Sequence, residues 1–235
     1  MKRLDDAVTV REQYAREDNL RARQSLYEET TGSDAREVLW DAIASLRPRR
    51  VLEVGGGPGE LAERMQHELH ADVASIDVSP RMVELARARR VAAEVGDVQA
   101  LPFADASFET VVAAWMLYHV PDLDRGLAEI ARVREPGGTL VAVTNSVDHL
   151  RELRGLIDYP RGFEETFNRE NGEEHLRRHF RRVERRDADG VVIVRDRTKL
   201  VAYRDSLSVE SRPIPENVEL PFLVHRRSSI FVATT

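Results

Sequence analysis

The sequence contains no cysteine, and this absence excludes several kinds of chemistry at once. Disulfide bonds, thiolate nucleophiles, cysteine-ligated zinc and iron–sulfur clusters all require that residue. No set of His, Asp and Glu residues has metal-ligand spacing, and the Gly-x-Ser-x-Gly motif of serine hydrolases does not occur. The chemistry of this chain must therefore come from other side chains or from a cofactor, without a bound metal.

Long apolar runs are also missing. The longest apolar stretch without a charged residue, Thr110–Val120, has about half the length that a bilayer-spanning helix needs. The first residues, from Met1 to Asp6, turn acidic at once and have no apolar core of a secretory signal. These features predict that the chain has no membrane span and works in the cytoplasm.

Aromatic residues are scarce, at 6% of the 235 residues, whereas 42% are apolar and 32% are charged. This balance can bury a core beneath a heavily charged surface, which argues against global disorder. The formal net charge of -6 argues against attraction of the whole surface to nucleic acid, although a local basic patch is compatible with it. The length predicts one domain.

Short β-branched runs alternate with amphipathic stretches in the middle of the chain. The runs have the length and the bounding turn residues of buried parallel strands: Arg50–Val54, Asp72–Asp77, Ala92–Val95, Thr110–Ala114 and Thr139–Thr144. The stretches between them have helical periodicity: Glu60–Leu69, Pro80–Arg90 and Asp122–Arg134. This alternation predicts an α/β fold with a doubly wound, mostly parallel sheet and right-handed crossovers.

The flanks of this region follow a different pattern. Before residue 48 we expect a helical lead-in with helices at Val8–Ser25 and Asp34–Leu46. After residue 145 we expect helices at Ser146–Ile157, Glu173–Phe180 and Leu200–Leu207, a hairpin of Val183–Arg186 and Val191–Val194 around Asp187–Gly190, and a strand at Ser229–Ala233. Residues 1–235 would then be a single domain, with the lead-in at 1–47, a ligand-binding core at 48–145, and substrate-side segments with the last strands at 146–235.

A glycine loop, Gly55-Gly56-Gly57-Pro58-Gly59, follows the first predicted strand and opens a helix. Such a loop turns backbone N–H groups and the helix N-terminus towards a pocket at the carboxyl end of the strand. A dinucleotide fingerprint would need glycine at position 60, but Glu60 stands there and would repel a pyrophosphate. No Gly-Lys-Ser/Thr follows, which excludes a P-loop.

Together with Glu53, the loop reads Glu53-x-Gly55-x-Gly57-x-Gly59 and resembles motif I of the class I S-adenosylmethionine-dependent methyltransferases. The later motifs of this family have counterparts in the same order and spacing: Ser75-Ile76-Asp77, Gly96–Phe103, Phe108–Ala114 with Leu117–Asp122, and Pro136–Leu140. One departure is Glu109, where the family usually has aspartate. The resemblance implies a Rossmann-like sheet of seven strands, S-adenosyl-L-methionine as the cofactor, and transfer of its methyl group to an O, N or C atom.

The resemblance also assigns cofactor-binding residues. Glu53 would support the loop or meet the amino group of the cofactor, and Asp77 would accept hydrogen bonds from both ribose hydroxyls. Asp97 would receive the adenine amino group, and Tyr14, in the lead-in, would close on the methionine carboxylate. The complete expected set is Tyr14, Glu53, Gly55, Gly57, Gly59, Asp77, Val78, Met82, Asp97, Val98 and the backbone of Ala114. The alternative is that the carboxylates are solvated strand ends and that Tyr14 belongs to an ordinary amphipathic helix.

Three side chains are candidates for removing a proton from the acceptor: His119, Tyr118 and His149. His119 follows the fourth predicted strand, near the place where the methyl group must point. However, Leu-x-His-Val-Pro-Asp occurs in family members with unrelated substrates, so a structural imidazole is the alternative. His149 would lie at the carboxyl edge of the sheet, together with Asn145, and its alternative is a capping residue on the surface.

The run from Arg177 to Arg186 holds six arginines, which could bind phosphate or RNA. The alternative is a solvated helix end and edge strand whose charge prevents aggregation. We expect a small-molecule acceptor from biosynthetic metabolism, with no nucleic-acid partner. The alternatives are an RNA or protein methyltransferase that uses the arginine run, and a non-catalytic cofactor-binding partner subunit. The sequence leaves the oligomeric state open, a homodimer included.

Overall fold

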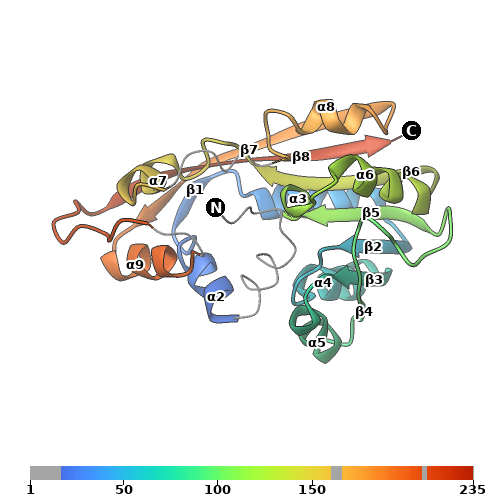
Figure 1. The fold of residues 1–235 in the computed structure, drawn as a ribbon, viewed down its shortest axis with the longest axis horizontal. Helices are drawn as coiled ribbons and strands as arrows, with labels where there is room; N and C mark the ends of the chain where they lie inside the picture. Colours follow the sequence, from blue (N-terminus) through green and yellow to red (C-terminus); the bar gives the residue numbers. More distant parts are fainter. Residues whose placement is uncertain (1–16, 160–165, 208–210, 235) are drawn as a thin grey trace.

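A single sheet of eight strands organises the computed structural model, which describes residues 17–159, 166–207 and 211–234 (Figure 1). The strand order is β1-β7-β8-β6-β5-β2-β3-β4. The strands are β1 (Thr30–Gly32), β2 (Arg50–Val54), β3 (Asp72–Asp77), β4 (Ala92–Val95), β5 (Phe108–Ala114), β6 (Arg134–Asn145), β7 (Arg182–Val194) and β8 (Phe222–Thr234). The helices are α2 (Glu17–Ser25), α3 (Ala35–Leu46), α4 (Glu60–Leu69), α5 (Pro80–Ala88), η1 (Leu117–His119), α6 (Leu123–Val133), α7 (Arg151–Leu156), α8 (Gly172–Arg177) and α9 (Arg197–Asp205).

The five central strands are parallel, and the order in which the chain adds them reverses after β4. From β2 it moves outwards through β3 to β4, and it then returns to the other side of β2 with β5 and β6. The remaining strands β8, β7 and β1 add antiparallel neighbours. This arrangement confirms the predicted doubly wound α/β fold, and it places a topological switch point between β2 and β5.

Successive residues of β2 show how the sheet is covered on both faces. Leu52 packs into a core cluster with side chains of α6 and α8, whereas Val51 packs on the other face with side chains of α3, α4 and α5. Both residues are completely buried, because helices cover both faces of the strand. A third cluster lies under α7 and α9, against β7 and β8.

The predicted bounds of β2, β3, β4 and α4 are confirmed residue by residue. Ser79 caps α5, since its side chain accepts a hydrogen bond from the Met82 N–H. The flanking helices are shifted or shorter than predicted, with α7 beginning at Arg151 and α8 ending at Arg177. The expected helix at Val8–Ser25 is observed from Glu17 onwards, and its earlier part, including Tyr14, lies outside the described residues.

The sheet has eight strands and not seven, because β1 joins its edge. This strand is only three residues long, Thr30-Thr31-Gly32, and it has no apolar alternation that would have revealed it. It pairs antiparallel with β7, with Gly32 opposite Gly190. An added Cβ on Gly190 would lie 2.3 Å from the Thr31 carbonyl oxygen, so a residue without a side chain is required there.

The predicted hairpin around Asp187–Gly190 is wrong. Residues Arg182–Val194 form one continuous strand that pairs with β8 along its whole length. Asp187, one of the polar residues that suggested a turn, has a partner in the sheet and another outside it: it accepts a hydrogen bond from the Ser229 hydroxyl of β8 at 2.6 Å, and it pairs with Arg169 at 2.8 Å. Gly190 is explained by close packing against β1 and not by a turn.

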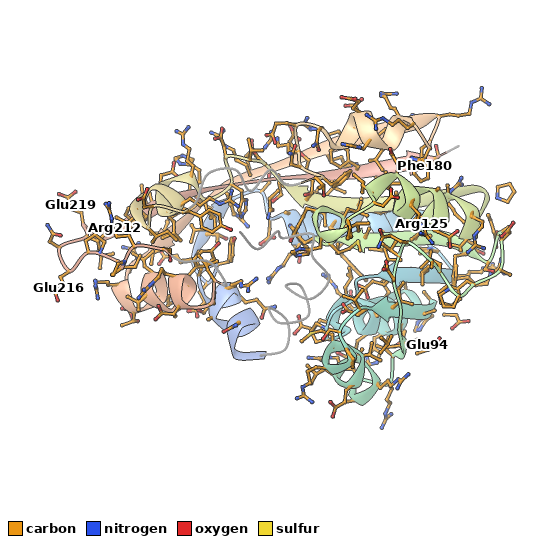
Figure 2. All side chains as sticks on the ribbon, viewed as in Figure 1. Glu94, Arg125, Phe180, Arg212, Glu216 and Glu219 are labelled. Carbon is orange, nitrogen blue, oxygen red and sulfur yellow. The ribbon has the colours of Figure 1, made fainter. Side chains whose placement is uncertain are left out.

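The charged loop that precedes β8 projects away from the body of the molecule. Its side chains Arg212, Glu216 and Glu219 point outwards at one end of the long axis (Figure 2). Within the described ranges, no helix is long and apolar enough to cross a membrane.

Candidate active site

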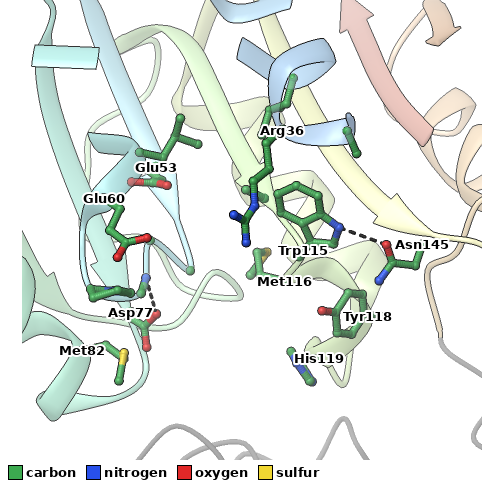
Figure 3. A pocket seen from close by; sticks show the side chains of 18 of the residues that line it. Arg36, Glu53, Glu60, Asp77, Met82, Trp115, Met116, Tyr118, His119 and Asn145 are labelled. Atoms are coloured by element: carbon green, nitrogen blue, oxygen red, sulfur yellow. Dashed lines mark hydrogen bonds between the residues drawn. The ribbon is translucent and has the colours of Figure 1, made fainter. Parts of the chain in front are cut away.

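A cavity of about 570 Å³ opens at the carboxyl ends of the central strands. It is lined by the glycine loop after β2, by Asp77 at the end of β3, by residues 114–116 after β5, and by Asn145 at the end of β6 (Figure 3). This is the switch point of the sheet, where open α/β folds bind their ligands. Parallel strands bring these residues together although they are far apart in the sequence.

Nearly all of the predicted site residues line this one cavity. They are Glu53, Gly55, Gly57, Asp77, Val78, Met82, Asp97, Val98, Ala114, Tyr118, His119 and His149. Gly59 does not line it; this residue starts α4 with a φ of 82°, and an added Cβ would lie 2.8 Å from the Ala86 Cβ. Tyr14 lies outside the described residues, so its expected role stays a prediction.

Asp77 ties the glycine loop to β3. Its Oδ2 accepts a hydrogen bond from the Gly57 N–H at 2.9 Å, and its Oδ1 accepts one from the Ser79 N–H at 2.8 Å. Burial raises the pKa of the carboxyl, while these two backbone donors favour the ionised form and lower it. Each carboxylate oxygen has a second lone pair, so Asp77 can accept two further hydrogen bonds from a ligand.

The glycine loop depends on the left-handed backbone conformation. Gly55 and Gly57 have φ values of 64° and 56°, which side chains strongly disfavour. An added Cβ on Gly55 would lie 2.7 Å from the Met116 Cβ, whereas a Cβ on Gly57 would meet no protein atom within 4 Å. A side chain at position 57 would occupy the cavity, so Gly57 leaves that space open to a ligand. Gly55 allows the loop to pack against the segment after β5.

Glu53 is a buried acid beneath the loop. Its side chain is 2% exposed, and Oε2 has no hydrogen-bond partner among the described residues. Burial raises its pKa to about 8, and the charge of Asp77 adds to this effect, while a hydrogen bond from the Ala62 backbone opposes it. Glu53 therefore tends to hold a proton near neutral pH, and a nearby cation would favour the ionised form.

Asp97 and Val98 follow β4 at the rim of the cavity. Val98 is buried, whereas Asp97 is exposed, and its carboxylate accepts hydrogen bonds from the backbone N–H and the side-chain amide of Gln99. Val78 and Met82 lie on the same side, after β3. This part of the wall is an apolar surface with the exposed carboxylate of Asp97 beside it.

The first two candidate bases lie after β5, within η1. Tyr118 and His119 are both half-buried, both line the cavity, and their ring centroids are 4.4 Å apart. Figure 3 shows them on the side of the cavity opposite Asp77 and Met82. Their position agrees with a place near the acceptor, and their catalytic roles stay predictions.

The third candidate, His149, is deeply buried, so the surface-exposed alternative is wrong. Its side chain is 6% exposed; Nδ1 lies 3.0 Å from the Arg227 carbonyl oxygen and Nε2 lies 2.9 Å from the Tyr27 hydroxyl. Burial lowers the pKa of His149 to about 4, and the charges of Arg154 and Arg226 lower it further against the effect of the Arg227 backbone. The imidazole is therefore neutral at physiological pH.

Several residues of the site were missed by the sequence reasoning. Tyr27 and Arg36 come from the lead-in, and Arg226 and Ser228 come from β8; all four line the cavity. The Arg36 side chain reaches into the middle of the cavity (Figure 3), and no described carboxylate lies within ion-pair distance of it. No motif marks these positions, because only the antiparallel strands and the lead-in bring them to the sheet edge.

The arginine run does not belong to the cavity. None of its residues lines the cavity, and four of them pair with acids on the same helix or strand: Arg177 with Glu173, Arg178 with Glu174, Arg182 with Glu184, and Arg185 with Asp187. Such exposed pairs are typical of a solvated surface.

Comparison with known proteins agrees with the geometry. Residues 52–142 match the family described as "Methyltransferase domain". The chain is 33% identical over 135 residues to methyltransferase GfsG of Streptomyces halstedii, a match that covers 54% of this chain and 46% of that protein. It is 37% identical over 125 residues to 27-O-demethylrifamycin SV methyltransferase of Amycolatopsis mediterranei, covering 48% of this chain and 46% of that protein.

A solved structure supports the fold over a longer range. Phosphoethanolamine N-methyltransferase 2 of Haemonchus contortus, in complex with S-adenosylhomocysteine, superposes with a TM-score of 0.64 at 17% identity. The superposition covers 100% of this chain and 60% of that chain. The curated relatives are matched over slightly less than half of their own length.

Proposed function

We propose that this chain is an enzyme that methylates an O, N or C atom of a small-molecule metabolite, because residues 52–142 match a methyltransferase domain and carry motifs that resemble those of the class I S-adenosylmethionine-dependent methyltransferases. S-adenosyl-L-methionine is the cofactor of this domain and supplies the methyl group on a sulfonium. The observation that carries the proposal is the meeting of the Gly55–Gly57 loop, Asp77 and Glu53 in one cavity at the switch point.

The cavity fits this cofactor and fits a phosphate-rich one poorly. Four acidic side chains border its loop side: Glu53, Glu60, Asp77 and Asp97. The ionised ones would repel a pyrophosphate and attract a sulfonium or an ammonium group, and a cation beside Glu53 would favour its ionised form as well. The orphaned Oε2 of Glu53 is the second indication, because a buried carboxyl oxygen without a partner is stabilised by a cationic donor.

Each part of the cofactor has a proposed contact. Asp77 holds the ribose hydroxyls, Val78 and Met82 cover the adenine, and Asp97 with Val98 meets its edge. Glu53 and the loop face the methionine part. Arg36 is proposed to bind the methionine carboxylate, since it extends into the cavity and has no described ion-pair partner.

The acceptor is proposed to enter on the opposite side, between residues 115–119 and the lining residues Asn145, Arg226 and Ser228. This placement agrees with the expected division of the chain into a lead-in, a cofactor-binding core and substrate-side segments. The protein has to exclude water and align the acceptor with the methyl carbon, since orientation alone can supply much of the acceleration. Where the acceptor is a hydroxyl, His119, Tyr118 or the Tyr27–His149 pair would remove its proton.

The relatives support a small acceptor. The name of the Amycolatopsis protein identifies a demethylrifamycin as its substrate, and another relative, from Renibacterium salmoninarum, is a demethylmenaquinone methyltransferase. Nothing in the cavity involves the arginine run that an RNA or protein methyltransferase would use. The expected cytoplasmic location and biosynthetic role stay predictions.

The test is formation of S-adenosylhomocysteine, followed by mass spectrometry with a panel of hydroxylated and carbonyl-containing metabolites. Product formed with one metabolite class, but not with RNA or histone peptides, is the expected result. Cofactor binding without turnover of any substrate would favour the non-catalytic partner subunit, and turnover of RNA would favour the first alternative.

A further inference from the structure

The side-chain amide of Asn145 is held in one orientation. Its Oδ1 accepts a hydrogen bond from the Trp115 Nε1–H at 3.1 Å and another from the Ser228 hydroxyl at 2.8 Å. An indole N–H can only donate, so the amide atom that faces Trp115 must be the oxygen. The Nδ2 amino group is consequently turned away from both partners, towards Tyr118 and the cavity (Figure 3).

This amino group is available to a ligand. No residue that the structure describes accepts a hydrogen bond from the Asn145 Nδ2, although the side chain is half-buried and lines the cavity. A donor fixed in place at the edge of a cavity, with no acceptor among the described residues, is suited to a ligand oxygen.

A guanidinium belongs to the same wall. Arg226 stands two residues before Ser228 on β8, so the two side chains share a face of the sheet. The Arg226 side chain is 8% exposed and pairs with Asp34 at 3.3 Å, and its buried Nε has no partner among the described residues. Arg23 and Arg36 line the cavity as well, and Asp34 is the only described carboxylate among the lining residues outside the acidic loop side.

We propose that this wall, defined by Asn145, Ser228 and Arg226, binds a carbonyl or carboxylate oxygen of the methyl acceptor. The acceptor is then an acid or an enolisable carbonyl compound, and not a basic amine. This inference rests on the proposed function and specifies its substrate class. An ammonium group would face the N–H groups of Asn145 and the guanidinium of Arg226, and it would leave the buried donors unsatisfied.

The proposed acceptor class also agrees with the reaction. A nucleophilic oxygen or carbon of the ionised acceptor forms the bond to the methyl carbon, the carbon–sulfur bond breaks, and its electron pair remains on sulfur. A carboxylate acceptor is already an anion and has no proton to lose at this step. An enolisable carbonyl compound first loses a proton, and His119 or Tyr118 of the same cavity would accept it. His149 is less suited to this role, because both of its nitrogens are engaged within the protein.

Asn145→Asp is a sharp test because it changes one group only. The aspartate keeps an oxygen for the Trp115 and Ser228 donors and replaces the amino group facing the cavity with an anionic oxygen. The probes are benzoate and benzylammonium, measured by ligand-observed NMR on protein saturated with S-adenosylhomocysteine. The wild type is expected to bind benzoate at least about tenfold more tightly than benzylammonium, and Asn145→Asp is expected to abolish or reverse this preference.

The control is the affinity for S-adenosylhomocysteine, which should be the same in both proteins. A loss of cofactor binding by the wild type would refute the proposed function itself, before any fragment is added. With the cofactor bound, the inference is refuted by equal or tighter binding of benzylammonium to the wild type, by binding of neither fragment, or by an unchanged preference in Asn145→Asp.

A crystal soak of the wild type gives a readout that does not depend on the variant folding. Benzoate is expected with a carboxylate oxygen within hydrogen-bond distance of the Asn145 Nδ2. Benzoate seated elsewhere in the cavity, with Nδ2 uncontacted, would contradict the assignment.

Discussion

Tyr27 and His149 are 122 positions apart in the sequence, yet the tyrosine hydroxyl lies 2.9 Å from the imidazole Nε2. Burial raises the pKa of Tyr27 and lowers that of His149, so both groups are neutral at physiological pH. The pair connects the lead-in to the segment after β6, and both of its members line the cavity. A buried neutral histidine also makes the stability of the protein depend on pH.

The first prediction concerns that dependence. His149 has a folded pKa of about 4, below its ordinary value of 6.5. Between these values the unfolded chain binds the extra proton, so falling pH destabilises the fold by up to about 1.4 kcal/mol per pH unit. In urea unfolding, the wild type should lose stability relative to His149→Gln between pH 6.5 and 4. Parallel stability curves for the two proteins would show that the imidazole is not held neutral.

Glu53 gives a second prediction with the opposite sign. Its folded pKa of about 8 exceeds its ordinary value of 4.5, so the folded protein retains a proton that the unfolded chain releases. The contribution of Glu53 to stability therefore decreases as pH rises from 4.5 to 8. We expect Glu53→Gln to become progressively more stable than the wild type across this range.

The second prediction extends to ligand binding, because the same residue should couple proton release to binding of the cofactor. A cation beside Glu53 stabilises its ionised form, so S-adenosylmethionine should displace the proton when it binds at pH 7. Calorimetry in buffers of different ionisation enthalpy should detect this release in the wild type and not in Glu53→Gln. A binding enthalpy that is independent of the buffer in the wild type would contradict the proposed contact.

The third prediction tests the ribose contact of Asp77. Asp77→Ala should weaken binding of S-adenosylhomocysteine by about 1–3 kcal/mol, the scale for hydrogen bonds to a charged group. Asp97→Ala is the matched control; it should cost less, because Asp97 is exposed and its hydrogen bonds to Gln99 are local. Calorimetry showing unchanged affinity in Asp77→Ala would count against the ribose role.

The fourth prediction concerns Arg36, which reaches into the cavity without a described ion-pair partner. Arg36→Gln should reduce the affinity for S-adenosylhomocysteine about tenfold while leaving 5′-methylthioadenosine unaffected, because the second compound lacks the carboxylate. Competition binding with both nucleosides makes the comparison. An equal effect on both compounds, or on neither, would remove Arg36 from the carboxylate contact.

The strands and the site residues could be predicted from the sequence where a buried strand carries a functional side chain at its carboxyl end. The bounds of β2, β3 and β4 could be predicted residue by residue because these strands are short runs between turn residues. The position of the ligand-binding side chains at their carboxyl ends follows from the parallel topology. Glu53 and Asp77 belong to such strand ends. These positions depend on local pattern and on one general property of parallel sheets.

The antiparallel half could not be predicted in the same way. Asp187–Gly190 has the composition of a turn, and only the long pairing with β8 explains its extended conformation. Tyr27 and Arg226 reach the cavity through contacts between distant segments, such as the Arg226–Asp34 ion pair and the Tyr27–His149 hydrogen bond. No short-range pattern encodes a partner that lies more than a hundred residues away.

A crystal structure of the protein with S-adenosylhomocysteine would show directly whether the cavity is a cofactor site. The ribose hydroxyls are expected to contact Asp77, the methionine part to lie over Gly55 and Gly57, and the sulfur to face the side of the cavity that bears Asn145 and His119. Nucleoside density elsewhere, or a cavity that stays empty at saturating ligand, would contradict it.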